Sequence, residues 1–153
     1  MKNKLNQPSH SLNESLAEYP KMKVTKLFLF VGALYELIIF PWIATLLSPD
    51  DSIGLLFILF FPVYLIAGGL FAMPTTLMMG KWHSYKEIYI QDGWWIRTFF
   101  MGVLINALFF VWFIFSKFGL VIWFSISLTG GVSAVLAGMS ALPVLKENVE
   151  DVG

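Results

Sequence analysis

The amino-acid sequence predicts an all-α, polytopic integral membrane protein built as a bundle of four transmembrane helices. Three observations support this fold class. Of the 153 residues, 58% are hydrophobic and 13% are charged, a composition outside the range of soluble globular domains. The apolar residues form four runs, each long enough to cross a hydrocarbon core of ~30 Å. Neither lysine nor arginine occurs inside any of these runs.

The four predicted spans are residues 27–47, 53–79, 98–115 and 119–142. They divide the chain into an N-terminal tail, a first hairpin, a connecting loop, a second hairpin and a C-terminal tail, at residues 1–26, 27–80, 81–97, 98–143 and 144–153. In the N-terminal tail, Ser11 and Glu14 are spaced as in a capping box, which predicts a short helix there.

Positive charges predict the orientation of the spans. Of the ten lysines and arginines, nine lie in the two tails and in the loop between the hairpins. Lys117 is the exception, and the first hairpin turn on its side carries Asp50 and Asp51. Because basic residues accumulate in cytoplasmic loops, we expect both termini to be cytoplasmic. The expected location is a cell membrane, the inner membrane of a bacterium, which the chain would cross several times.

Charge and cysteine content exclude several classes of function. The net charge is zero and the basic residues are scattered, so the sequence gives no support for a nucleic-acid partner. The chain has no cysteine, which excludes disulfides, thiolate metal sites and cysteine nucleophiles. We therefore expect no metal and no other cofactor.

Aromatic residues dominate the loop at 81–97. Trp82, Tyr85 and Tyr89 recur at helical spacing and predict an amphipathic turn in the lipid headgroup layer. His83 and Glu87 are four residues apart and would share a helix face, but two ligands make a weak metal site, and an ordinary interfacial histidine is the preferred interpretation. Two further tryptophans mark the membrane interface at the start of the third span: Trp94 and Trp95.

The two hairpins resemble each other at an offset of 70 residues. FVGALYELIIFPW, which begins at Phe30, aligns with FMGVLINALFFVW, which begins at Phe100, and LIAGG at residue 65 aligns with VLAGM at residue 135. We interpret this as a duplicated two-helix unit. Both copies would run in the same direction through the membrane, so equivalent residues would lie at equal depth. At this offset, Glu36 corresponds to Asn106.

Glu36 is the only acidic residue in any predicted span. A charge at the bilayer centre costs at least ~2.5 kcal/mol, so this carboxyl must be protonated, hydrogen-bonded or exposed to water. Asn106 is the preferred hydrogen-bonding partner, because it offers both donors and an acceptor at the same depth. The alternative partners are hydroxyl groups in the second and fourth spans: Tyr64, Ser125, Ser127 and Thr129.

Glycines and prolines add to the prediction near this pair. Gly32 and Gly102 each precede the polar residue by one turn and would permit close helix contact. Pro41 cannot donate a hydrogen bond to the Leu37 carbonyl, which predicts a kink and a partly free acceptor. Further kinks are expected at Pro62 and Pro74, in a second span that is longer than a bilayer requires.

A row of small residues at spacing four, Gly130, Ala134 and Gly138, marks one face of the fourth span. Such a row permits close packing, either inside the bundle, which is the preferred interpretation, or between copies of the chain. A homo-oligomer is therefore one expected state.

Three function classes remain open. The preferred hypothesis is a non-catalytic protein that acts through another membrane protein, as an accessory subunit, a regulator or an immunity-type inhibitor. The second is a small proton- or cation-coupled transporter or channel that uses Glu36. An interfacial enzyme using His83, Glu87 or Asp92 is the third, and it is disfavoured because these residues do not make a nucleophile, base and orienting group.

Overall fold

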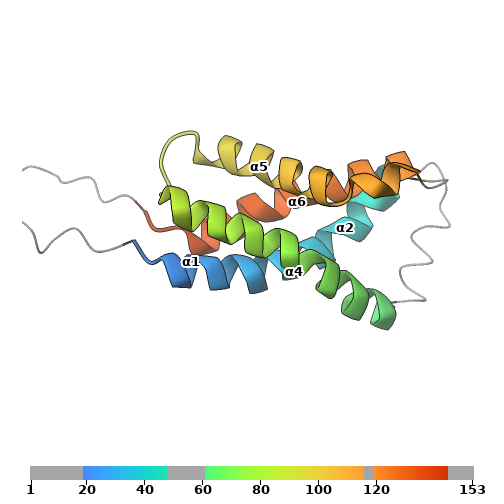
Figure 1. The fold of residues 1–153 in the computed structure, drawn as a ribbon, viewed down its shortest axis with the longest axis horizontal. Helices are drawn as coiled ribbons and strands as arrows, with labels where there is room; N and C mark the ends of the chain where they lie inside the picture. Colours follow the sequence, from blue (N-terminus) through green and yellow to red (C-terminus); the bar gives the residue numbers. More distant parts are fainter. Residues whose placement is uncertain (1–18, 48–60, 116–118, 145–153) are drawn as a thin grey trace, which may run out of the picture.

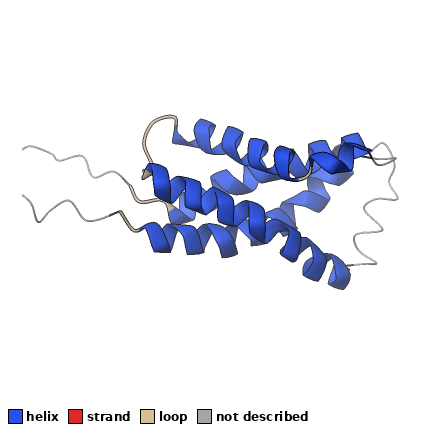
Figure 2. Ribbon diagram, in the orientation of Figure 1, coloured by secondary structure: helices blue, strands red, loops and turns tan. Residues whose placement is uncertain are grey.

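The computed structural model of the protein describes residues 19–47, 61–115 and 119–144. In these ranges the backbone is helical, with short loops and no sheet (Figure 2). Four helices lie side by side along the long axis of the molecule (Figure 1). The first is continuous from α1 (Lys21–Leu27) through the π-helical turn η1 (Phe28–Gly32) to α2 (Ala33–Leu47).

The other three helices complete the described fold. They are α4 (Phe61–Lys86), α5 (Trp94–Phe109), which is followed by the 3-10 helix η2 (Val111–Phe115), and α6 (Gly119–Ala141). Helix α6 packs against both α2 and α5, whereas α4 packs mainly against α1, η1 and α2. Helices α2 and α5 therefore lie on opposite sides of the interior, and they approach each other only through side chains.

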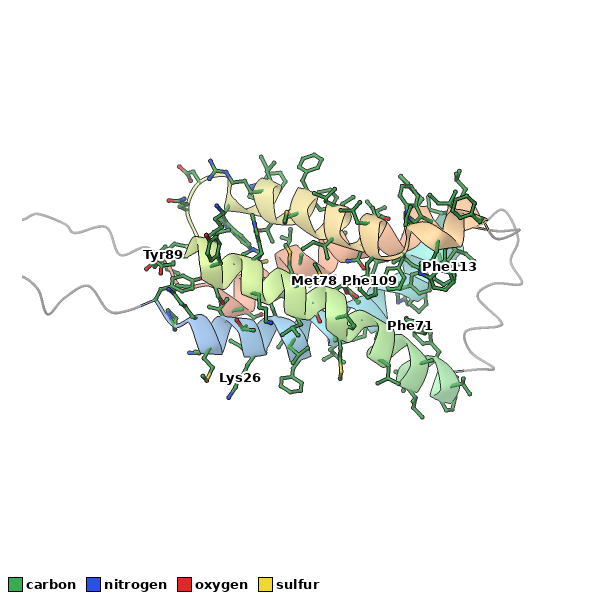
Figure 3. The ribbon with its side chains drawn as sticks, in the orientation of Figure 1. Lys26, Phe71, Met78, Tyr89, Phe109 and Phe113 are labelled. Carbon is green, nitrogen blue, oxygen red and sulfur yellow. The ribbon has the colours of Figure 1, made fainter. Side chains whose placement is uncertain are left out.

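Three of the four helices, at Lys21–Leu47, Pro62–Lys86 and Gly119–Ala141, are long and apolar enough to cross a membrane, which indicates a membrane protein. The remaining helix, α5, has 16 residues, about 24 Å at 1.5 Å per residue. Apolar side chains point outward from the helices; Phe71, Met78 and Phe109 are examples (Figure 3). An outer surface of this kind suits contact with lipid rather than water.

Several helix boundaries differ from those predicted. The first helix begins at Lys21 instead of residue 27, because Val24 and Phe28 are buried one turn apart while Lys26 points away from the other helices (Figure 3). An amphipathic turn thus extends the apolar run. The predicted short helix near Ser11 lies outside the described residues.

Helix α4 likewise continues past the predicted end of the second span at residue 79, as far as Lys86. The reason is a buried face at spacing four, Met79 and His83, which keeps the polar extension packed against the other helices. The predicted loop of 81–97 is consequently much shorter: the backbone is non-helical only between the end of α4 and Trp94, where α5 begins. The third span also differs, since α5 begins before residue 98 and ends at Phe109.

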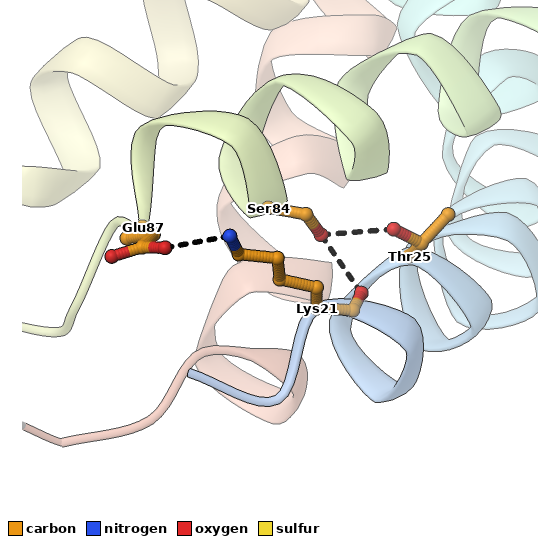
Figure 4. Close-up of polar contacts among 4 residues, drawn as sticks. All are labelled: Lys21, Thr25, Ser84 and Glu87. Carbon is orange, nitrogen blue, oxygen red and sulfur yellow. Dashed lines mark hydrogen bonds and ion pairs between the residues drawn. The ribbon is translucent and has the colours of Figure 1, made fainter. Parts of the chain in front are cut away.

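Contacts at one end of the molecule join the first helix to the end of α4. The Lys21 ammonium forms an ion pair with the Glu87 carboxylate at 2.8 Å, and the Ser84 hydroxyl donates to the Lys21 carbonyl at 2.9 Å (Figure 4). The Thr25 and Ser84 hydroxyl oxygens are 2.8 Å apart (Figure 4). The first and last described residues lie at this same end (Figure 1).

Tyr19 fastens the chain just before α1 to the turn after α4. Its hydroxyl donates to the Ile88 carbonyl at 2.8 Å, and its ring meets the Tyr89 ring edge to face. Burial, followed by the nearby Tyr89 and Glu87 side chains, raises the pKa of Tyr19 to about 12. The phenol therefore remains a neutral donor throughout the physiological range of pH.

Helices α5 and α6 make the most extensive contact in the described fold. A side chain at Gly102 would collide with the Gly130 carbonyl and would lie 2.8 Å from the Ala134 methyl carbon. At Gly138 a methyl group would lie 2.6 Å from the Trp94 ring. Small residues on α6 thus leave room for α5 within one chain.

Gly102→Ala tests this close contact, with Gly69→Ala as its matched control. Gly102→Ala forces α5 and α6 apart and should lower the free energy of unfolding by about 1–3 kcal/mol. A methyl group at Gly69 meets nothing closer than a Leu37 methyl at 3.8 Å, so the control should be neutral or slightly stabilised by its better helix propensity. Thermal unfolding of both variants in the same detergent measures the difference. Equal melting temperatures would contradict the packing described above.

Candidate functional site

Glu36 and Asn106 meet in the interior between α2 and α5. The Asn106 side-chain amide donates to Glu36 Oε1 at 3.3 Å and to the Gly102 carbonyl at 3.2 Å. Both side chains are buried, with 9% of Glu36 and 3% of Asn106 exposed. The structure therefore brings together the two residues that the hairpin alignment paired.

Two hydroxyl groups complete the surroundings of the carboxyl group. Thr75 Oγ1 on α4 lies 3.4 Å from Glu36 Oε2, and Ser133 Oγ on α6 lies 3.5 Å from Glu36 Oε1. All four helices thus contribute a side chain to this site. Ser133 was not among the partners predicted for Glu36 from the sequence. Its position one turn beyond Gly130, on the face of the small residues, was the signal that could have found it.

The protons of both hydroxyls have closer acceptors than the carboxyl group. Thr75 Oγ1 is 2.8 Å from the Ala72 carbonyl, and Ser133 Oγ is 3.3 Å from the Gly130 carbonyl. A hydroxyl has one proton, and O–H···O hydrogen bonds are usually 2.5–3.0 Å long. The Thr75 proton is therefore given to the Ala72 carbonyl, whereas Ser133 lies at similar distances from both oxygens and can donate to the Gly130 carbonyl or to Glu36.

The Asn106 side-chain oxygen, Oδ1, is the one buried side-chain polar atom in the described residues without a hydrogen-bond partner. Turning the amide over would not solve this, because Oδ1 would then face the Gly102 carbonyl in place of the donating nitrogen. Gly130 holds the side chain from the other side, since any Cβ there would overlap the Asn106 amide. An acceptor is thus fixed in the interior with no donor.

A small cavity of about 10 Å³ lies at this site. Its walls include the polar side chains described above and Thr76, together with apolar groups of Phe28, Ile105 and Met79. This volume is about that needed for a single water molecule or ion of similar size. The site is therefore a small interior chamber in which a few polar side chains are surrounded mainly by apolar surface.

The π-helical turn η1 comes one turn before Glu36 in the same helix. Such single widened turns interrupt the α-helical hydrogen-bond ladder and are frequent at functional sites. The Thr76 hydroxyl on α4 approaches the Leu29 carbonyl of this turn at 3.4 Å, and a Cβ at Gly32 would lie 3.1 Å from the Thr76 methyl carbon. The π-helical turn therefore packs closely against Thr76 of α4 beside the chamber.

Two backbone carbonyls that are 70 residues apart each accept a hydrogen bond from a side chain of a neighbouring helix. Pro41 has no N–H to donate to the Leu37 carbonyl, which instead accepts a hydrogen bond from the Tyr64 hydroxyl at 2.8 Å. Seventy residues later, the Ala107 carbonyl accepts from the Trp123 indole N–H at 2.9 Å, where α5 is about to end. Sequence reasoning predicted the free acceptor at Leu37 but not its counterpart.

The other prolines and hydroxyls take less direct roles. Pro74 lies within α4, and Thr75 and Thr76 donate to the Ala72 and Met73 carbonyls beside it. Pro62 is in the first described turn of α4, and the preceding turn lies outside the described residues. The three hydroxyls that the sequence offered as alternative partners donate to carbonyls of their own helix: Ser125, Ser127 and Thr129.

His83 is fully buried, although the sequence analysis placed it in an interfacial loop. Its Nδ1 lies 2.8 Å from the Met79 carbonyl and must donate to it, so in the neutral ring Nε2 accepts from the Thr98 hydroxyl at 3.0 Å. The ring also stacks on Phe28. His83 therefore ties α4 to α5 and to the first helix, and it is not available to an interfacial ligand.

The remaining loop aromatics are spread over several environments. Tyr85 is 80% exposed and Trp95 is 55% exposed, whereas Trp82, Tyr89 and Trp94 are partly buried. The predicted common face of Trp82, Tyr85 and Tyr89 is thus wrong, because the buried face of this turn runs through His83. Glu87 leaves the helix with a positive φ of 48° and pairs with Lys21, so it does not join His83 as a ligand.

Comparisons with known proteins found no match: no protein-family model, curated protein or solved structure is similar enough to this chain to identify a relative.

A double-mutant cycle tests the role of Tyr64 beside Pro41. Tyr64→Phe removes the side-chain donor to the Leu37 carbonyl and should lower the free energy of unfolding by about 1 kcal/mol. In a Pro41→Ala background the new backbone N–H at residue 41 can donate to the same carbonyl, and Tyr64→Phe should then cost much less. Thermal unfolding of the four proteins measures the coupling. Additive effects would show that Tyr64 does not compensate for the proline.

Proposed function

We propose that the protein is a four-span membrane protein in which Glu36 reversibly binds a proton or a monovalent cation, as the coupling site of a small transporter or channel. The observation that supports this proposal is the chamber around Glu36, in which acceptor oxygens outnumber donors. The nearest donor to an ionised carboxylate there is the Asn106 amide at 3.3 Å, while Thr75 gives its proton to the Ala72 carbonyl and Ser133 is 3.5 Å away. The uptake of a positive charge therefore lowers the free energy of such a site.

The number of charges favours a monovalent ligand. Glu36 is the only ionisable residue among those that form the chamber. Tyr64 is the other titratable side chain near enough to interact with it electrostatically. In a medium of low dielectric constant, one carboxylate is neutralised by one proton or one singly charged cation, whereas a divalent ion would leave an unbalanced charge.

The same proposal includes two duplicated hairpins. Residues 70 apart have equivalent surroundings: Gly32 and Gly102 are buried, and Leu34 and Leu104 are exposed on the outer face. Glu36 contacts its own equivalent, Asn106. When equivalent residues of two copies touch, they lie at the axis that relates the copies. A chamber on that axis is where a duplicated transporter would hold its ion.

The four-span topology with cytoplasmic termini is part of the proposal and can be tested separately. The chain lacks cysteine, so single cysteines can be introduced as labels without a background. We expect Gln91→Cys to react with an impermeant maleimide only from the cytoplasmic side and Asp50→Cys, which lies outside the described residues, only from the outer side. Labelling of intact cells and inverted vesicles makes the comparison. Reaction of both cysteines from one side would contradict the four-span topology.

Infrared spectroscopy tests the binding of a proton at Glu36. The C=O stretch of a protonated carboxyl group in an apolar interior is distinct from the bands of exposed acids, and it should disappear reversibly as the pH rises. Glu36→Gln should remove this band while the melting temperature stays near that of the wild type, because the amide keeps the size and the hydrogen bonds of the acid. A band that does not change with pH while the protein is folded would mean a permanently protonated structural group, and the proposal would fail.

The hypothesis that the protein acts through another membrane protein stays a prediction. The apolar outer surface is compatible with a membrane partner, with a second copy of the chain or with lipid alone. The chamber at Glu36 is the more specific feature, and for this reason ion binding is proposed here.

A further inference from the structure

We infer that the ligand of the chamber is Na⁺, held by the carboxylate of Glu36, Oδ1 of Asn106 and the hydroxyl oxygens of Thr75 and Ser133. This inference rests on the proposed function and specifies its ligand. The residues come from all four helices, so an ion at this point would join them.

Hydrogen-bond acceptors are in excess in the chamber around Glu36. Glu36 offers two oxygens, Thr75 and Ser133 offer one each, and Asn106 Oδ1 is without a partner. A single proton on Glu36 can satisfy only one of these acceptors, since it supplies one hydrogen bond. A cation contacts several oxygens at once and satisfies them together.

The spacing of the hydroxyl and carboxyl oxygens in the chamber also fits a bound cation. The distances of 3.4 Å from Thr75 Oγ1 to Glu36 Oε2 and of 3.5 Å from Ser133 Oγ to Glu36 Oε1 are too long for good hydrogen bonds. Ligand oxygens about 2.4 Å from an ion, the distance typical of Ca²⁺ and of the nearly equal-sized Na⁺, are about 3.4 Å apart when they subtend a right angle. The observed separations therefore match the edge of a coordination shell.

Size and charge then select among cations. Mg²⁺ binds oxygens at about 2.0–2.1 Å and would need them closer together. K⁺ is larger and would need them farther apart than they are. Ca²⁺ has a suitable radius, but the chamber holds one carboxylate, which balances only a single positive charge. Among the described residues there is also no group of three His, Cys, Asp or Glu side chains that could hold a multivalent metal.

The Asn106 side chain is held in place before any ligand binds. The Gly102 carbonyl fixes which end of the amide faces Glu36, and the missing side chain at Gly130 leaves room for the amide and little else. Because the acceptor Oδ1 is fixed before any ligand binds, little conformational entropy is lost on binding.

Equilibrium dialysis with radiolabelled Na⁺ tests the inference on the purified, full-length protein in detergent. We expect saturable binding of one Na⁺ per chain, which decreases as protons compete at low pH. Glu36→Gln should abolish the binding, and Ser133→Ala should weaken it by about tenfold or more. The matched control is Ser140→Ala, which removes an exposed hydroxyl from the same helix and should bind Na⁺ like the wild type. Melting curves establish that each variant is folded.

The outcomes separate the two proposals. If the wild type binds no Na⁺ but the Glu36 carbonyl band titrates with pH, the ligand is a proton alone; the inference fails and the proposed function stands. If neither Na⁺ binding nor titration is seen, both fail, and the chamber holds at most a structural water. Saturable binding that persists in Glu36→Gln would place the ion elsewhere and would also overturn the inference.

Discussion

The close contact of α5 with α6 determines the arrangement of the interior. Gly102 and Gly130 let the two backbones approach so nearly that Asn106 has a single position, with its amide between the Gly102 carbonyl and Glu36. A larger residue at either glycine would move the amide away from the carboxyl group. The polar site thus depends on the absence of two side chains. The two glycines that make it possible destabilise their helices locally.

The chamber combines features that oppose each other energetically. Apolar walls raise the free energy of an ionised Glu36, and the Thr75 hydroxyl does little to lower it, because its proton is given to the Ala72 carbonyl. A structural polar cluster would be expected to satisfy its members fully. The unpartnered Asn106 oxygen and the long contacts to Glu36 are instead typical of a site whose balance depends on a ligand.

Much of the fold, but less of the site, could be predicted from the sequence. Long apolar runs gave the helices, and the offset of 70 residues paired Glu36 with Asn106, because both depend on repeating patterns along one chain. Ser133 and Thr75 were not assigned to Glu36, since their approach depends on how helices distant in sequence rotate against each other. The burial of His83 was missed for the same reason: a polar residue at the end of an apolar run reads as interfacial until its partners, Met79 and Thr98, are known.

The paired carbonyls of Leu37 and Ala107 have a mechanical consequence. On α2 and on α5, a side chain of a neighbouring helix, Tyr64 or Trp123, donates to a backbone carbonyl just beyond the chamber. Helix α2 has a proline there, whereas α5 ends and continues as the 3-10 helix η2. A bond between side chain and carbonyl can be exchanged without unwinding a helical turn, so bending is easier there than elsewhere along either helix. Bending at Leu37 and at Ala107 would therefore tilt the helical segments that follow these residues without separating Glu36 from Asn106.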